Sequence, residues 1–247
     1  MSISNDDALF LSKLDDAVYL SQKRGKAYFL SFLSERRQAL AQAHFKSEGF
    51  EDYAFFGGYE GAERKVLGIF PYEPEEFPVD ALEFKFRKVD KLTHRDFLGA
   101  LMSLGIERET VGDILVEDGR CVVFVKSEIS GYITSQVFKI GNAGVTVGTA
   151  DPQTIPKGRG FDEKDYTVSS LRLDAVIAAV TGLSREKTKS LILSGSVSRN
   201  YECCQNISKT LSVQDTFTVR GKGKYILSGV IGETKKHRLR ISIIHFR

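Results

Sequence analysis

The spacing of apolar residues changes along the chain, and each change predicts a different kind of element. Near Leu14 and again over residues 29–40, apolar side chains recur every three or four positions, which predicts two amphipathic helices. Residues 53–56 and 66–70 alternate as strands do, and the glycine-rich stretch between them is interpreted as a plain strand connection. Residues 1–76 are therefore expected to form an N-terminal domain of helices and a hairpin.

Residues 77–155 carry the pattern of a second domain. They predict a strand over 81–87, a helix that Thr93 caps, two strands joined by an Asp-Gly turn, a helix from Ser127 and a strand over 145–147. This order is the split pattern of ferredoxin-like domains, which many RNA-recognition modules share. The aromatic residues of its strands are interpreted as core rather than as a base-stacking platform; they are Phe84, Phe86 and Phe124.

The last third of the chain predicts a pair of helices with a small sheet. Residues 156–168 contain proline and glycine without an apolar period, and they predict an exposed linker. Residues 169–247 then begin with an apolar helical stripe that Gly182 ends. Ser184 caps a second helix, which is expected to bury Leu191 and Ile192. The predicted fold class is α+β, with a ferredoxin-like middle domain between the helix-and-hairpin domain and this C-terminal domain.

The distribution of charge is more informative than the net charge of +3. Residues 169–247 hold 14 Lys and Arg against 5 Asp and Glu, whereas the preceding residues hold 21 against 27. This asymmetry indicates that the C-terminal domain, and not the whole chain, meets a polyanion. We expect RNA rather than DNA, because a shallow rigid face suits shape and phosphate contacts and no recognition helix with base-reading Asn or Gln is apparent.

Other classes of protein find little support in the sequence. Cys121, Cys203 and Cys204 have no metal-ligand spacing, and no Ser/His/Asp arrangement suggests a hydrolase. No apolar run approaches the ~20 residues of a membrane span, and the first residues are polar and acidic, unlike a signal peptide. We expect a cytoplasmic protein without membrane contact, metal, cofactor, catalytic residue or small-molecule substrate.

The candidate RNA-binding residues all lie in the C-terminal domain. Arg220, Lys222 and Lys224 alternate with glycines, so that backbone amides and cationic side chains can approach a phosphate backbone together. Arg185 and Lys189 are one helical turn apart. The full predicted set is Arg172, Ser184, Arg185, Lys187, Lys189, Arg199, Asn200, Arg220, Lys222 and Lys224.

The motifs of this domain resemble the S-four RNA-binding domain, named after ribosomal small-subunit protein four. They are Arg172-Leu173-Asp174, Ser184-Arg185, Leu191-Ile192, Gly195, Val197, Asn200, Asp215 and Val219-Arg220-Gly221-Lys222-Gly223. The order of the whole chain resembles the YlmH-like bacterial proteins, on motifs that include Gly57-Gly58-Tyr59-Glu60-Gly61, His94-Arg95-Asp96-Phe97 and Gly112-Asp113-Ile114. This resemblance implies a non-catalytic, ribosome-linked protein that docks on ribosomal RNA, with tRNA as a further candidate, on the large subunit or on stalled nascent chain–tRNA complexes.

Two alternatives stay open at this point. Pseudouridine synthases use the Asp of an Arg-Leu-Asp motif as nucleophile, and Arg172-Leu173-Asp174 has that order; here the triplet begins the first helix of the binding domain itself, which argues against catalysis. The acidic first two-thirds of the chain also fit a scaffold or cell-division accessory protein whose RNA affinity is incidental.

Overall fold

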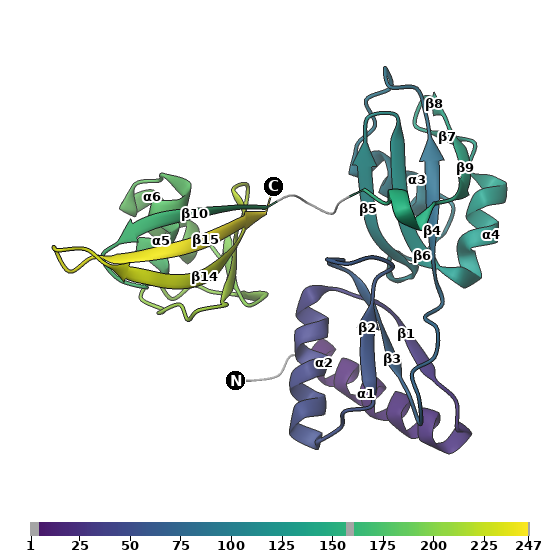
Figure 1. Cartoon of the computed structure of the whole chain (residues 1–247), viewed down its shortest axis with the longest axis horizontal. Coiled ribbons are helices and arrows are strands. Elements are labelled where there is room, and N and C mark those ends of the chain that lie inside the picture. Colours follow the sequence, from purple (N-terminus) through teal and green to yellow (C-terminus); the bar gives the residue numbers. More distant parts are fainter. Residues whose placement is uncertain (1–4, 157–160, 247) are drawn as a thin grey trace. The chain divides into compact units, whose positions relative to one another are not determined.

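The computed structural model describes residues 5–156 and 161–246, and the chain divides into two compact units at about residue 158 (Figure 1). The first unit contains the N-terminal and middle segments together, and the second contains the C-terminal segment. Both units combine helices with antiparallel sheets, as the α+β prediction requires. None of the described helices is long and apolar enough to cross a lipid bilayer.

The N-terminal segment packs two helices against a small antiparallel sheet. Its elements are α1 (Asn5–Arg24), β1 (Tyr28–Leu33), α2 (Glu35–Glu48), β2 (Tyr53–Phe56) and β3 (Lys65–Ile69), with the strand order β1-β3-β2. Phe10 and Leu14 of α1 and Phe45 of α2 pack against Leu67 and Ile69 of β3. The predicted hairpin of β2 and β3 is confirmed.

The predicted helix over residues 29–40 is wrong in its first part. Tyr28–Leu33 forms strand β1, and α2 begins only at Glu35. A β-bulge between Phe29 and Phe32 adds a residue to the strand, so both phenylalanines pack into the same apolar cluster. The bulge therefore produces an apolar spacing of three, which imitates the period of a helix.

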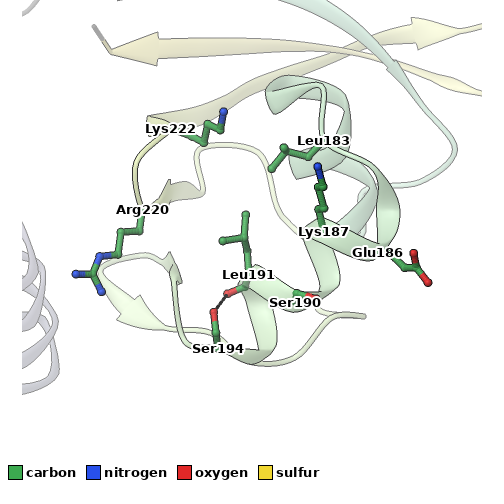
Figure 2. Close-up of a pocket in the computed structure, with 8 residues that line it drawn as sticks. All are labelled: Leu183, Glu186, Lys187, Ser190, Leu191, Ser194, Arg220 and Lys222. Carbon is green, nitrogen blue, oxygen red and sulfur yellow. Dashed lines mark hydrogen bonds between the residues drawn. The ribbon is translucent and has the colours of Figure 1, made fainter.

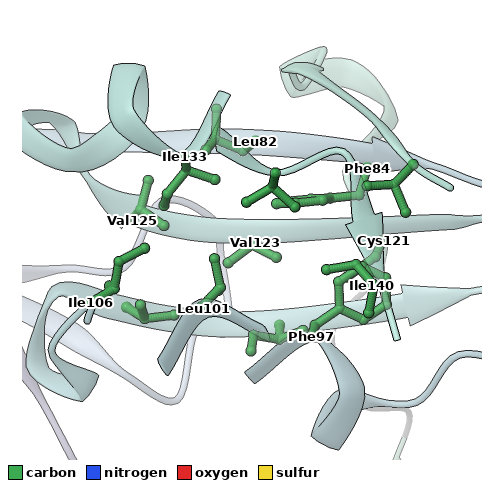
Figure 3. Close-up of a cluster of buried hydrophobic side chains, with 14 residues drawn as sticks. Leu82, Phe84, Phe97, Leu101, Ile106, Cys121, Val123, Val125, Ile133 and Ile140 are labelled. Carbon is green, nitrogen blue, oxygen red and sulfur yellow. The ribbon is translucent and has the colours of Figure 1, made fainter. Parts of the chain in front are cut away.

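The middle segment has the predicted order of elements. They are β4 (Val79–Lys85), α3 (His94–Ser103), the short helix η1 (Arg108–Thr110), β5 (Val111–Glu117), β6 (Arg120–Lys126), α4 (Ser127–Gln136), β7 (Lys139–Ile140), β8 (Ala143–Gly144), β9 (Thr146–Thr149) and η2 (Pro152–Thr154). The main sheet has the order β5-β6-β4-β9. Phe97 of α3 and Ile133 of α4 pack with Phe84 of β4 in the core on one face of this sheet (Figure 3).

The other face of the middle sheet packs against the N-terminal segment. Phe124 of β6 is completely buried there, and its ring stacks on Tyr59 with the ring centroids 4.7 Å apart. Gly58 permits this contact: its φ is +96°, and a Cβ atom would collide with the Phe124 ring. Phe124 is thus a core residue, as predicted, and the segments predicted as two domains share this apolar cluster.

A second bulge, in β5, aims Asp113 at the N-terminal segment. The Asp113 carboxylate accepts hydrogen bonds from the Tyr59 hydroxyl, at 2.9 Å, and from the backbone N–H groups of Glu63 and Arg64, at 2.7 and 3.1 Å. The Arg64 guanidinium donates to carbonyl oxygens of β1 and β5. Burial, together with the neighbouring Arg108, lowers the pKa of Arg64 to about 10. These polar contacts fix the two segments to each other.

In the second unit, two short helices pack against an antiparallel sheet (Figure 1). The elements are β10 (Phe161–Val168), α5 (Leu173–Thr181), α6 (Arg185–Leu193), β11 (Val197–Arg199), β12 (Glu202–Cys203), β13 (Thr216–Val219), β14 (Gly223–Glu233) and β15 (Leu239–Phe246). The strand order is β10-β15-β14-β13-β11-β12. Gly182 ends α5 in the left-handed conformation, with φ +67°, as predicted. Ile177 and Ile192 of the helices and Phe217 of β13 lie in the core.

The predicted linker over residues 156–168 is wrong over Phe161–Val168. This stretch forms β10, which pairs with β15 along its whole length. Val168 is buried and Tyr166 packs against the core, but charged residues at most other positions hide this alternation in the sequence. The linker prediction for residues 157–160 falls outside the described residues.

Replacement of Asp113 by alanine should destabilise the first unit, because two backbone N–H groups and the Tyr59 hydroxyl lose a charged acceptor. We expect the free energy of unfolding to fall by about 2–3 kcal/mol. Urea denaturation followed by circular dichroism measures the change. The control is Asp118→Ala, since that side chain is 76% exposed and pairs with the similarly exposed Lys91; its effect should stay within about 0.5 kcal/mol. Equal losses in both variants would contradict the role given to Asp113.

Candidate RNA-binding surface

The side chains that α6 buries set its orientation. Thr188 and Ile192 are completely buried, and Ser184, a predicted RNA-binding residue, is the N-cap whose hydroxyl accepts a hydrogen bond from the backbone N–H of Lys187, at 3.3 Å. Residues three and four positions apart share one side of a helix. One such stripe lines an open groove of about 750 Å³ (Figure 2). The stripe consists of Leu183, Glu186, Lys187, Ser190, Leu191 and Ser194.

The connection between β13 and β14 forms the opposite side of the groove with Arg220 and Lys222. The backbone N–H of Arg220 donates to the carbonyl oxygen just before β11, at 2.9 Å. Gly221 has a φ of +75°, which glycine adopts without strain. At Gly223, with φ +118°, a Cβ atom would lie 2.7 Å from Nε2 of His245. The glycines therefore allow a tight turn, which places two exposed cations beside α6.

Lys187, Arg220 and Lys222 are the predicted RNA-binding residues that the fold brings together at this groove. All three are exposed, and within the described parts of the chain no hydrogen bond or ion pair engages their side chains. Glu186 is the acidic residue of the lining, and Figure 2 shows its carboxylate directed away from Arg220 and Lys222. The groove thus offers three unneutralised cations to an anionic ligand.

Other predicted cations lie elsewhere on the unit. Arg185 and Lys189 are exposed, but helical geometry rotates them to a different side of α6 from Lys187. Lys224 lies over aromatic rings, with its ammonium nitrogen 4.8 Å from the ring centroid of Phe246. The residues predicted as one basic face therefore occupy more than one side of the unit.

Three further residues of the predicted set are held by carboxylates. Arg172 donates from Nε to Asp174 at the start of α5, at 3.0 Å. Nε of Arg199 and Nδ2 of Asn200 both donate to Asp215, each at 2.7 Å. These contacts give the three side chains a role in the fold, and their binding to RNA stays a prediction.

Asp215 organises the hairpin of β11 and β12. It is 6% exposed and also accepts a hydrogen bond from the backbone N–H of Ser212, at 2.7 Å. Burial acts to raise the pKa of Asp215, but the hydrogen bonds from Ser212, Asn200 and Arg199 outweigh it and hold that pKa below its usual range. The turn that Asp215 supports is tight, with φ +48° at Asn200 and +68° at Tyr201. This two-residue turn forms although Tyr201 stands where glycine would be unstrained.

Sequence reasoning missed the uncharged residues of the groove. Leu191, which was expected in the core, is only partly buried and lines the groove together with Leu183. Ser190 and Ser194 lie beside them. Ser190 and Ser194 lie three and seven residues after Lys187. The helical spacing that identified the apolar stripe of α5 could therefore also have identified this stripe of α6.

Comparison with known proteins places these features in context. Residues 72–154 match the family model described as the putative RNA-binding domain in YlmH. The ribosome-associated protein quality control protein P2 of Bacillus subtilis (strain 168) is 31% identical over 244 residues, which cover 96% of this chain and 94% of that protein. Among solved structures, the cell division protein ylmH from Streptococcus pneumoniae matches with a TM-score of 0.55 and 20% identity, over 63% of this chain and 98% of that one. The last similarity concerns the fold alone.

Asp215→Ala should destabilise the second unit, because Arg199 and Asn200 would lose their shared acceptor. We expect a loss of about 2–4 kcal/mol in the free energy of unfolding at pH 7. Because the folded-state pKa is depressed, this contribution is complete above the usual aspartate pKa and is lost as the pH falls through the lower folded value. The difference between native chain and variant should therefore shrink below about pH 4.

Thermal or urea denaturation over a pH series measures this difference. Asp165→Ala is the matched control, since Asp165 is 54% exposed and pairs with the 53% exposed Arg240 at 3.5 Å. Its effect should stay below about 1 kcal/mol. A loss in Asp215→Ala that does not depend on pH would contradict the ionised carboxylate as the stabilising group.

Proposed function

The chain belongs to the family of the Bacillus subtilis ribosome-associated protein quality control protein P2, and from this membership we propose that it is a ribosome-associated protein that binds structured ribosomal RNA. The C-terminal unit makes the main contact, through the groove between α6 and the β13–β14 turn. The observation that carries the proposal is the group of three exposed cations there, Lys187, Arg220 and Lys222, which no carboxylate of the described residues neutralises.

The chemistry of the groove suits a phosphate backbone. Each Lys or Arg that neutralises a phosphate releases condensed counterions, and this release supplies much of the affinity for RNA. Lys187 comes from a helix and Arg220 and Lys222 come from one turn, so the three charges are held on two separate parts of the folded unit. Such an arrangement recognises the shape and phosphate positions of folded RNA rather than a sequence.

We also propose the finer layout that the sequence predicts. In this layout a helix-and-hairpin domain covers residues 1–76, a ferredoxin-like domain covers residues 77–155, and an S-four-type domain covers residues 169–247, to which the structure adds strand β10. The large ribosomal subunit, or a stalled nascent chain–tRNA complex on it, is the proposed docking site, and tRNA is a further candidate ligand. The name of the Bacillus relative supports this assignment to ribosome quality control.

The first unit would then position the protein or contact a further partner. Its middle segment matches a model described as a putative RNA-binding domain, but Phe124 on its sheet is buried beneath Tyr59. Bases therefore have no access to that ring, and an RNA contact of this segment would require another surface.

We propose that the protein acts without catalysis. Asp174, which holds the position of a pseudouridine synthase nucleophile in the Arg-Leu-Asp order, is 8% exposed and engaged by Arg172 at the first turn of α5. A carboxylate neutralised in this way supports a role in the fold rather than as a nucleophile. If Asp174→Asn folded normally but abolished a modification of cellular RNA, the non-catalytic assignment would be wrong.

The triple variant Lys187→Glu, Arg220→Glu, Lys222→Glu should bind purified large ribosomal subunits at least about tenfold more weakly, because three charge-assisted contacts become repulsive. The dependence of log affinity on log salt should also become less steep, by about 2–3. Co-sedimentation over a salt series, with folding checked by circular dichroism, measures both quantities.

A charge-matched control is available on the first unit. Lys13, Lys46 and Lys88 are exposed, and the corresponding triple substitution by glutamate changes net charge by the same amount. The proposal requires this control to bind nearly as the native chain does, apart from a small long-range effect. If both triple variants lose affinity equally, or if native binding is independent of salt, the groove is not the docking surface and a protein partner is favoured.

A further inference from the structure

The groove is larger in volume, and its lining is more apolar, than the binding of phosphate groups alone requires. Its volume of about 750 Å³ lies within the range of about 300–1,000 Å³ found for pockets that hold small organic ligands. Leu183 and Leu191 contribute apolar surface to the lining, and Leu191 lies between Arg220 and Lys187 in Figure 2. Cations that only tracked a backbone would need no such hollow between them.

We propose that this groove accommodates an unpaired nucleotide base that is extruded from a folded RNA, while the surrounding cations bind the phosphates on either side of it. The inference rests on the proposed function and names the part of the RNA that this site takes. Base edges in A-form helices are hard to reach, so specific RNA recognition commonly uses bases splayed out of loops and bulges. An extruded base is apolar on its faces and polar at its edge, which matches a lining of leucines beside hydroxyl groups.

The charges around the hollow are complementary to this occupant. An extruded nucleotide has a phosphate on each side of its sugar, and the lining presents Lys187 on one wall with Arg220 and Lys222 on the other. The Ser190 hydroxyl makes no side-chain hydrogen bond to any residue that the structure describes, so it can donate to or accept from a base edge. The Ser194 hydroxyl, in contrast, already donates to the Leu191 carbonyl oxygen, at 3.0 Å.

The test compares two RNA hairpins of equal length, one fully paired in its stem and one with a single-nucleotide bulge that carries 2-aminopurine. We expect the native full-length chain to bind the bulged hairpin about tenfold more tightly. The 2-aminopurine fluorescence should change on binding, because the base leaves its neighbours in the RNA and enters the groove.

Ser190→Phe fills the groove from an exposed helical position without altering its charge. This variant should bind the paired hairpin as the native chain does, but should lose the preference for the bulge and the fluorescence change. Ser208→Phe is the matched control, at an exposed serine of the same unit that does not line the groove, and it should keep both.

The outcomes separate this inference from the proposed function. A native chain without preference for the bulge, or a Ser190→Phe variant that keeps the preference, would overturn the inference alone. If the triple glutamate variant bound both hairpins as the native chain does, the proposed function itself would fail.

Discussion

The second unit depends on one buried carboxylate, Asp215. It gathers donors from Arg199, Asn200 and the backbone of Ser212, and so it fixes the turn of the β11–β12 hairpin against the start of β13. Strand β13 leads directly into the turn that carries Arg220. The same carboxylate forms an ion pair with Arg199. Asp215 therefore supports the hairpin next to the strand that leads to Arg220, and it pairs with one of the basic residues of the unit.

The first unit is organised by a different constraint, the close approach of two sheets. Gly58 leaves space for the Phe124 ring, and a bulge in β5 brings Asp113 to the backbone of Glu63 and Arg64. The consequence is functional as well as structural, because the sheet face that RNA-recognition modules use for base stacking is covered at Phe124. The groove of the second unit therefore remains the proposed RNA contact.

Local patterns were sufficient to predict much of the fold. The end of α5 at Gly182, the cap of α6 at Ser184 and the order of elements in the middle segment follow from sequence-local chemistry. The errors arose where the folded structure does not follow the spacing of apolar residues along the sequence. A bulge gave β1 the spacing of a helix, and charged residues concealed β10. The sequence identified the basic residues of the second unit but not the carboxylates with which some of them pair. Asp215, for example, lies 16 residues from Arg199 and meets it only in the folded sheet.

The most direct measurement is site-specific photocross-linking of the full-length chain to ribosomes. A photoreactive phenylalanine derivative would replace Ser194, which lines the groove, or Tyr19, which is 58% exposed on α1. We expect cross-links from position 194 to one defined region of ribosomal RNA, and their loss in the triple glutamate background. Cross-links to RNA from position 19 with none from position 194 would contradict it.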